Sequence, residues 1–272
     1  TPDASDFSAA RFDAALELSE HLAHMFSDVK NVGHKRAGAA NLYIRGSQSK
    51  SGLKSIPVST LILDELAEMV EENIPLATKR TSGQIDKTLT WMISTPTIAG
   101  KNINKYYMQT TQEEFWFRCP SCSKLIRFVF PDSLMITADG LEDEGIYNSY
   151  YQCTECRNKL EHATKWEYLA TGIWVPQKTT ATIGRGFTLS QMYSSAGDAH
   201  PVKMAQAYFQ AKKDPAAEQE LYNSVLGVPH AVEGSSITDE QLEAAILNGP
   251  KHRRDDPPKV GLITMGIDVG KT

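Results

Sequence analysis

The sequence predicts an α/β fold, in which a parallel sheet is followed by a cysteine-rich β insertion and a helical segment. Two apolar segments, 55–65 and 87–97, each end in polar residues, as strands of a parallel sheet do. Short aromatic-rich segments then surround two C-x-x-C pairs, and helical spacing of apolar residues returns at 200–227. These three observations together indicate the fold class.

The expected elements of the first half follow in order along the chain. A helix is expected over Ser8–Phe26, where apolar residues recur at helical spacing. Strands are expected at 40–49 and 55–65, on either side of a loop rich in Ser, Gly and Lys, and again at 87–97. The middle of 87–97 is almost continuously apolar, which is typical of a fully buried strand in a parallel sheet.

The C-terminal part of the chain is expected to be helical and then to return to a strand. Helical spacing covers 200–227, with a break at Asp214-Pro215, and resumes at 238–249. A charged, proline-containing linker occupies 251–259. The apolar segment 260–270 after it is expected to form a strand.

Composition limits the class of protein. The chain has 272 residues, of which 41% are hydrophobic and 22% charged, and its net charge is −5. This mild acidity argues against a protein that coats nucleic acid by bulk charge, while a local basic groove stays possible. No apolar run approaches the roughly 20 residues that span a bilayer, and a signal-peptide pattern is absent, so a cytoplasmic setting is expected.

An acidic pair ends the segment 55–65. Asp64 and Glu65 follow a short apolar run, and a carboxylate at the C-terminal end of a parallel strand points into the crevice where α/β sheets bind ligands. There Asp64 would hold Mg²⁺, and Glu65 would orient and deprotonate the water that attacks a phosphoryl group. The alternative is a solvated pair that caps the next helix.

Small hydroxyl residues end the next strand. Ser94 and Thr95 precede Pro96 at the tip of 87–97, where hydroxyl groups can sense a γ-phosphate and relay its loss. A strand that is ended by a proline turn would look the same. Because the acidic and hydroxyl motifs occur in order on consecutive strands, they favour a site for nucleotide hydrolysis.

The sequence contains a G-K-T at its end but no phosphate-binding loop of the form G-x-x-x-x-G-K-[ST]. The upstream glycine of such a loop would stand at Met265, and Gly266 leaves the loop one residue short. We therefore interpret 260–270 as a strand that presents Asp268. Nucleases of the RNase H type present their first metal-binding carboxylate in this way.

Four cysteines form two C-x-x-C pairs, Cys119 with Cys122 and Cys153 with Cys156. Each pair offers two thiolates from one tight turn, and two such pairs close a tetrahedral Zn²⁺ site that staples a small subdomain. A redox dithiol or buried free thiols are the alternatives, although redox chemistry would place one pair at the start of a helix. The flanking cations, which can contact phosphates or stay solvated, are Lys124, Arg127, Arg157 and Lys159.

Several stretches of the sequence occur in the same order as in one known family, and together they span nearly the whole chain. They are FSAARFD with LYIRGSQSKSGLKSIPVSTLILDELAEM, MISTPT, the two C-x-x-C pairs, GFTLSQMYSS followed by LYNSVLGVP, and the closing GIDVG. The chain resembles an internal segment of the large subunit of tailed-phage terminases of the lambda (GpA-like) type, which are DNA-packaging motors. The stretches around and after the cysteines narrow the resemblance, because many motors share the acidic and Ser-Thr-Pro motifs.

The resemblance implies a role for each motif. Asp64 and Glu65 correspond to the Walker B pair, Ser94 and Thr95 to the motif that couples hydrolysis to DNA movement, and Asp268 to the first nuclease carboxylate. The family's phosphate loop would then lie upstream of the chain and the rest of the nuclease beyond it. The chain by itself is accordingly expected to be inactive. For the arginine that stabilises transferred charge, the candidates are Arg11, Arg45 and Arg80.

The resemblance also implies a fold and its division. The expected fold is the C-terminal part of a P-loop ATPase-type parallel sheet, with a zinc-ribbon-like β insertion, a helical linker and the first strand of an RNase H-like nuclease. The expected limits are 1–114 for the first part of the ATPase domain and 115–175 for the Cys₄ insertion. The rest of the ATPase domain with the linker would occupy 176–258, and the nuclease would begin at 259–272.

The activity that the resemblance implies is ATP-driven translocation of double-stranded viral DNA into a procapsid, together with cutting of concatemeric DNA. The implied cofactors are ATP, Mg²⁺ and Zn²⁺. The implied partners are double-stranded DNA, the small terminase subunit, the portal protein and further copies of the chain in a ring, in the host cytoplasm. The alternatives are a helicase-type ATPase with a zinc ribbon and a non-catalytic zinc module that binds DNA.

Overall fold

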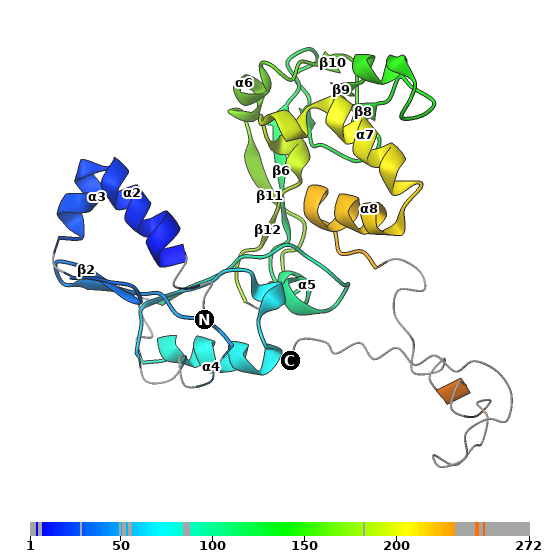
Figure 1. The fold of residues 1–272 in the computed structure, drawn as a ribbon. Coiled ribbons are helices and arrows are strands. Elements are labelled where there is room, and N and C mark those ends of the chain that lie inside the picture. Colours follow the sequence, from blue (N-terminus) through cyan, green and yellow to red (C-terminus); the bar gives the residue numbers. More distant parts are fainter. Residues whose placement is uncertain are drawn as a thin grey trace, which may run out of the picture. The chain divides into compact units, whose positions relative to one another are not determined.

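The computed structural model describes residues 7–27, 29–48, 56–83, 88–181 and 183–231, and besides these the single positions 4, 50, 53, 243, 244 and 247. The chain divides into two compact units, Thr1–Val232 and Glu233–Thr272, and nearly all described residues belong to the first (Figure 1). The expected strand at 260–270 lies outside the described residues, as do most positions of the expected helix at 238–249.

The fold combines helices with parallel and antiparallel sheets, which confirms the predicted α/β class. The α-helices are α2 Ala14–Leu18, α3 Glu20–Met25, α4 Ile74–Thr78, α5 Asn102–Tyr107, α6 Lys165–Leu169, α7 Pro201–Ala211 and α8 Pro215–Glu220. Segments of π-helix are η1 Phe7–Asp13 and η8 Leu221–Val225. The short 3-10 turns are η2 Leu66–Glu68, η3 Glu71–Asn73, η4 Lys79–Thr81, η5 Glu144–Asn148, η6 Gln191–Tyr193 and η7 Gly197–Ala199.

The strands in the described part of the chain form four separate sheets. In chain order the strands are β1 Val29–Asn31, β2 His34–Ala37, β3 Ala40–Tyr43, β4 Thr60–Leu63, β5 Leu89–Met92, β6 Glu113–Arg118, β7 Leu125–Ile126, β8 Leu134–Met135, β9 Tyr150–Gln152, β10 Lys159–Leu160, β11 Ile173–Pro176 and β12 Phe187–Thr188. None of the helices in the described part of the chain is both long and apolar enough to cross a membrane.

The N-terminal helix predicted over Ser8–Phe26 forms in three pieces, η1, α2 and α3. The chain is extended at Ser19 (φ −130°, ψ 105°), and the Ser19 hydroxyl accepts a hydrogen bond from the Leu22 amide at 3.4 Å. Ser19 therefore caps α3, because its side chain satisfies an amide that the first helical turn leaves unpaired. The prediction of one continuous helix was wrong at this residue.

The strands β1, β2 and β3 form an antiparallel sheet after these helices. β3 confirms the start of the strand predicted at 40–49, whereas β1 and β2 are short and mostly polar, so they show no apolar alternation. Lys35 of β2 is fully buried, and its ammonium lies 2.7 Å from an Asp13 carboxylate oxygen of η1. This ion pair connects the sheet to the N-terminal helical segment.

The strands β4 and β5 pair in parallel, with Thr60 opposite Leu89 and Leu63 opposite Met92. Their parallel arrangement is as predicted from 55–65 and 87–97. One face packs on a small core built around Leu66 and Ile74, but on the other face Ile62 and Trp91 are 59% and 49% exposed. The predicted full burial of the second strand was therefore wrong, because the described helices and turns cover a single face of this two-stranded sheet.

The cysteine-rich region, here called the Cys module (residues 115–175), is built around β6. β11 and β7 pair with β6 in antiparallel fashion, β12 pairs with it in parallel, and β8, β9 and β10 form a second sheet. The backbone approaches closely at Gly186, where a Cβ atom would overlap the Thr110 side chain. Next to it, the Arg185 guanidinium donates two hydrogen bonds of 2.6 Å to Glu113, so β12 is fastened to β6 by both contacts.

A buried lysine joins the Cys module to the loop that follows β12. Lys165, at the start of α6, is fully buried, and its ammonium donates to the carbonyls of Met192 (2.9 Å) and Ser194 (2.8 Å). It also lies 4.3 Å from the centroid of the Tyr151 ring. Burial lowers the pKa of Lys165 to about 7, while the carbonyls and the aromatic ring favour the ammonium form.

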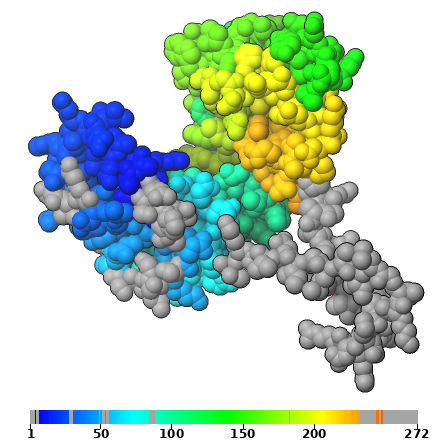
Figure 2. Space-filling model, in the orientation of Figure 1, coloured from blue at the N-terminus to red at the C-terminus, as the bar shows by residue number. Residues whose placement is uncertain are grey.

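The helical segment predicted at 200–227 is confirmed, including its break at Asp214-Pro215. The Asp214 carboxylate accepts a hydrogen bond from the Ala216 amide at 3.0 Å, and Pro215 occupies the first turn of α8. α7 packs on the core with Met204, while α8 continues into η8. In the space-filling view, α7 and the orange end of this segment form one continuous surface (Figure 2).

Candidate functional site

The acidic pair lies where β4 ends, beside the end of β5. The Ile93 amide donates to the Leu63 carbonyl (2.9 Å), and beyond the pair the Leu66 amide donates to the Ile93 carbonyl (3.1 Å). Asp64 and Glu65 are both exposed, and one Asp64 carboxylate oxygen accepts a hydrogen bond from the Glu65 amide at 3.1 Å. The backbone around the pair is thus fixed by β5, whereas both carboxylates are open to solvent.

Glu65 has an unusual backbone conformation. Its φ and ψ are both 50°, in the left-handed region that non-glycine residues rarely adopt. This conformation costs roughly 1–2 kcal/mol for a residue with a side chain. It turns the chain sharply from β4 into η2 and lets the Glu65 side chain line a cleft. Strained residues of this kind occur preferentially at functional sites.

Ser94 and Thr95 differ in their surroundings. The Ser94 hydroxyl accepts a hydrogen bond from the Ala67 amide at 2.9 Å and donates to the Thr95 carbonyl at 3.2 Å. It therefore ties the end of β5 to the turn that follows the acidic pair. Thr95 is exposed and lines the same cleft as Glu65. The hydroxyl that is available to a ligand is accordingly that of Thr95.

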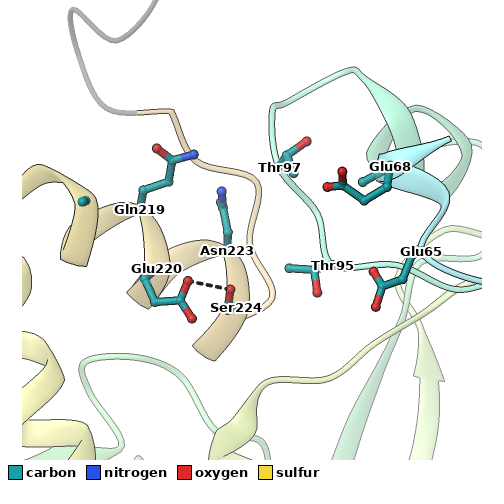
Figure 3. A pocket seen from close by; sticks show the side chains of 10 residues that line it. Glu65, Glu68, Thr95, Thr97, Gln219, Glu220, Asn223 and Ser224 are labelled. Atoms are coloured by element: carbon teal, nitrogen blue, oxygen red, sulfur yellow. Dashed lines mark hydrogen bonds between the residues drawn. The ribbon is translucent and has the colours of Figure 1, made fainter. Parts of the chain in front are cut away.

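The cleft has a volume of about 410 Å³ and two walls (Figure 3). One wall comes from the ends of β4 and β5 and the other from α8 and η8. The lining residues are Glu65, Ala67, Glu68, Thr95 and Thr97 on the first wall, and Ala216, Gln219, Glu220, Asn223 and Ser224 on the second. The structure therefore brings Glu65 and Thr95 together, as expected from parallel strands.

The second wall was not anticipated from the sequence. Asn223 is 5% exposed, although it lies in a helical segment whose other buried residue is Leu221. A polar residue on the buried stripe of a helix is the signal that could have indicated it, because such a residue needs a partner. The stretch that contains it, LYNSVLGVP, entered the sequence analysis through its resemblance alone.

The arginine candidates lie away from the cleft lining. The Arg80 carbonyl accepts from the Val58 amide (3.2 Å), and its Nε donates to the Leu76 carbonyl, so Arg80 lies near the start of β4. β4, whose four residues span about 13 Å at roughly 3.3 Å per residue, lies between this backbone contact and Asp64. Arg11 and Arg45 do not line the cleft either. Asp268 lies outside the described residues.

The four cysteines converge in the Cys module, and their sulfur atoms all lie within 4.8 Å of one another. The Sγ atoms of Cys119 and Cys156 are 3.8 Å apart, and those of Cys122 and Cys153 are 3.9 Å apart. Four thiolates around Zn²⁺ at about 2.3 Å in tetrahedral geometry would be about 3.8 Å apart. All four are free of disulfides, so the donor set and its spacing fit a zinc ion.

The two cysteine turns repeat one backbone geometry. In the first, the Ser123 amide donates to the Cys119 carbonyl (2.9 Å), and in the second the Arg157 amide donates to the Cys153 carbonyl (3.0 Å). Ser123 and Arg157 both have positive φ, 58° and 61°. Each turn follows a strand, β6 or β9, and precedes a short return strand. Both pairs therefore lie in turns between strands, and neither begins a helix.

Backbone amides also point at the sulfur of Cys153. The amides of Glu155 and Cys156 lie 3.4 and 3.5 Å from it. Burial raises the pKa of the Cys153 thiol to about 12, so in the absence of a cation it keeps its proton. A bound divalent ion would replace that proton, and the two amides would stabilise the resulting thiolate.

Most cations near the cysteines are paired with carboxylates. The ion pairs are Lys124 with Glu155 (2.8 Å), Arg127 with Glu114 (3.1 Å) and Lys159 with Glu161 (3.1 Å). Arg157 donates to the carbonyl of Asp132 at 3.5 Å. The flanks of the cysteine turns are therefore close to electroneutral, which argues against a phosphate-binding surface there.

The chain matches two family models that together cover most of its length. Residues 1–174 match the phage terminase large subunit gpA, ATPase domain, and residues 184–272 match the terminase large subunit gpA, endonuclease domain. No curated protein and no solved structure matches the chain significantly. An ATPase segment followed by an endonuclease segment defines the class of viral DNA-packaging enzymes.

This chain belongs to the phage terminase large subunit gpA family, which confirms the resemblance found in its sequence. Its function is the packaging and cutting of phage DNA, and the complete protein is an ATPase and an endonuclease that uses nucleotide and divalent metal. It acts on DNA together with other packaging proteins. The matches do not favour the helicase-type enzyme or the non-catalytic zinc module.

Proposed function

We propose that the cleft between β4, β5 and α8 is the ATP hydrolysis site of the packaging motor. The observation that carries this proposal is the junction of the two strand ends, where the Ala67 amide donates to the Ser94 hydroxyl and Glu65 and Thr95 face one cavity. Phosphoryl transfer to water depends on positioning and charge neutralisation, and carboxylates and hydroxyls at the ends of two parallel strands can supply both.

Each residue has a part in this chemistry. Asp64 adjoins the cleft without lining it, and its exposed carboxylate would hold Mg²⁺, which neutralises charge on the phosphates when it is bound. Glu65 would orient the attacking water and take its proton, because its carboxylate reaches the cleft from a fixed, strained backbone. Thr95 would contact the γ-phosphate, and Ser94 would keep the two strand ends in register.

We propose that Cys119, Cys122, Cys153 and Cys156 bind a structural Zn²⁺ in a zinc-ribbon-like insertion. Support comes from the sulfur spacing and from the two matching turns. The ion would hold the hairpin of β6 and β7 against that of β9 and β10. Because all four ligands come from the protein, the site has no open position for catalysis.

The remaining assignments rest on the family. We propose that β4 and β5 belong to a P-loop-type ATPase sheet and that Asp268 is the first metal ligand of an RNase H-like nuclease. The expected domain limits, with the nuclease starting at 259, stay a prediction, and the endonuclease family model matches from residue 184. We further propose that the protein contacts the phosphates of double-stranded DNA without reading its bases. Its proposed partners are the small terminase subunit, the portal protein and further copies of the chain in a ring, and its proposed setting is the host cytoplasm.

The direct test is an Asp64→Ala substitution in the complete subunit. Loss of the Mg²⁺ ligand removes several kcal/mol of charge stabilisation, so kcat for ATP should fall at least roughly a thousandfold. Asp198→Ala, which removes an exposed carboxylate outside the cleft, is the matched control and should keep normal turnover. Turnover that survives in Asp64→Ala would contradict the assignment.

A further inference from the structure

The two walls of the cleft come from segments that match different family models. Glu65, Thr95 and Thr97 lie in the stretch that matches the ATPase domain. Gln219 and Asn223 lie in the stretch that matches the endonuclease domain, and they face the first wall across the cleft (Figure 3). Both segments therefore contribute side chains to the lining of one cleft.

One backbone amide joins the two walls. The His230 amide donates to the Thr97 carbonyl (2.9 Å) and also to the Asn223 side-chain oxygen (2.8 Å). Asn223 is almost fully buried, so this hydrogen bond is protected from water. The loop after β5, the η8 segment and the chain at residue 230 are thus fastened at a single point.

The chain around His230 is held firmly on α8 and η8. It turns back at Gly227, whose φ is +67°, and the Val228 amide donates to the Tyr222 carbonyl at 2.8 Å. The His230 ring stacks on Tyr222 with centroids 4.4 Å apart, and its Nε2 lies 3.1 Å from a Glu218 carboxylate oxygen. A displacement of the His230 amide would therefore carry the helix with it.

The first wall connects the same point to the acidic pair. The Leu66 amide bonds the Ile93 carbonyl, and the Ala67 amide bonds the Ser94 hydroxyl. From there the chain runs through Thr95 to Thr97. A continuous path of hydrogen bonds and covalent chain therefore leads from Glu65 to Asn223.

Asn223 has a second polar group that this path does not use. Among the residues that the structure describes, no acceptor pairs with its side-chain nitrogen, and the residue lines the cleft. The other groups on the cleft walls include three carboxylates, those of Glu65, Glu68 and Glu220. An uncharged N–H donor among carboxylates is suited to contact an anionic phosphate without adding to the repulsion.

We propose that Asn223 is a positioning residue that couples the nucleotide state of the cleft to the endonuclease-matched segment. Its nitrogen contacts the bound nucleotide, and its oxygen holds the His230 amide against Thr97. Loss of the γ-phosphate changes both contacts together and is transmitted to α8 and η8. This inference rests on the proposed function of the cleft as the hydrolysis site.

Hydrogen exchange of the complete subunit, with and without Mg²⁺ and the non-hydrolysable analogue β,γ-imido-ATP, tests the coupling. In the wild type, the analogue should slow exchange of the amides at 216–230 by roughly fivefold or more, the lower end of typical coupling between sites. Asn223→Ala should reduce that change to less than roughly twofold, while exchange around Glu65 still responds to the analogue.

Two further variants separate coupling from a merely structural role. Asn223→Asp keeps an oxygen that can accept from the His230 amide but lacks the nitrogen that contacts the nucleotide. Without the analogue, its residues 216–230 should exchange as in the wild type, and with the analogue they should show less than roughly twofold slowing. Asn148→Ala removes an exposed amide from the end of η5, outside the cleft, and should behave as wild type.

The outcomes distinguish this inference from the function on which it rests. If the analogue changes exchange neither at 216–230 nor around Glu65, the hydrolysis site itself is misassigned. If exchange around Glu65 responds but 216–230 does not, the coupling is overturned while the hydrolysis site stands. A wild-type response in Asn223→Ala would likewise overturn the coupling. The wild-type measurement alone can contradict the proposal, so the test does not depend on any variant folding.

Discussion

The surroundings of the four cysteines and the cleft differ in how completely their polar groups are satisfied. In the Cys module, four sulfurs converge within 4.8 Å, backbone amides point at Cys153, and most flanking cations are paired. In the cleft, Glu65 is exposed and strained, and Asn223 keeps an unpaired nitrogen among the described residues, while Asp64 next to Glu65 is exposed beside the cleft. A structural site is closed by its own chain, whereas a reaction site keeps groups free for a substrate.

The two regions also differ in the sequence distance that they span. Each cysteine turn is a local hairpin whose geometry is set by a few consecutive residues. The cleft needs the ends of two parallel strands and a helix from residues 215–225, far along the chain. Folding of the Cys module should therefore depend on its metal, and that of the cleft on long-range packing.

Removal of a cysteine should have the largest effect. Cys153→Ser lacks one of four ligands and should lose about one equivalent of zinc, together with most of the roughly 10 kcal/mol or more that such a site contributes. Metal analysis and thermal unfolding of the complete subunit measure this, with Ser121→Ala in the adjoining turn as control. If Cys153→Ser kept its full zinc content and unfolded at the wild-type temperature, the Cys module would not be held closed by a metal. The contrast with the cleft would then be contradicted.

Replacement of the buried lysine should have an intermediate effect that depends on pH. The pKa of Lys165 is lowered to about 7 in the folded protein, against about 10.4 in an unfolded chain. Between these values the unfolded state binds more protons, so stability relative to Lys165→Met should rise with pH, by up to about 1.4 kcal/mol per pH unit. Denaturant unfolding of both proteins from pH 7 to pH 10 measures the difference.

The same pH series also shows whether the contacts of the Lys165 ammonium offset the effect of its burial on the pKa. Two carbonyls and the Tyr151 ring accept the ammonium of Lys165. If they compensate its burial completely, the two proteins would change stability in parallel with pH. Parallel curves would contradict a lowered pKa at Lys165.

Local patterns predicted much of the fold. The parallel strands, the helical segment with its break at Asp214-Pro215 and the loops that carry the cysteines follow from periodicity, capping and spacing. The break at Ser19 and the exposure of Trp91 were missed. A serine inside an apolar pattern fits a helix or a cap equally well, and burial depends on what covers the sheet.

The candidate site was predictable on one wall only. Glu65 and Thr95 could be placed together, because the ends of parallel strands meet at one edge of a sheet. Asn223 and Gln219 could not be placed there, since the position of a helix relative to a distant strand end is set by tertiary packing. The separate surroundings of Ser94 and Thr95 depend on individual hydrogen bonds, which spacing does not reveal.

The smallest stability effect, and the most direct test of the contrast, comes from Glu65→Gly in the complete subunit. Glycine adopts a φ of 50° without strain, so the variant should be more stable, by roughly 1 kcal/mol, in spite of a lost side chain. It lacks the carboxylate that accepts the proton from water, so ATP turnover should fall by roughly 10²-fold or more. Both readouts come from one purified protein.

That paired measurement, ATP turnover and unfolding of Glu65→Gly against wild type, tests the central claim that the chain maintains a strained, open carboxylate for catalysis. Turnover that is lost while stability is equal or higher is the predicted result. Turnover within about twofold of wild type would contradict a catalytic Glu65, because a positioned general base contributes at least roughly 10²-fold. A variant much less stable than the wild type would contradict the claim that the left-handed backbone conformation of Glu65 is strained.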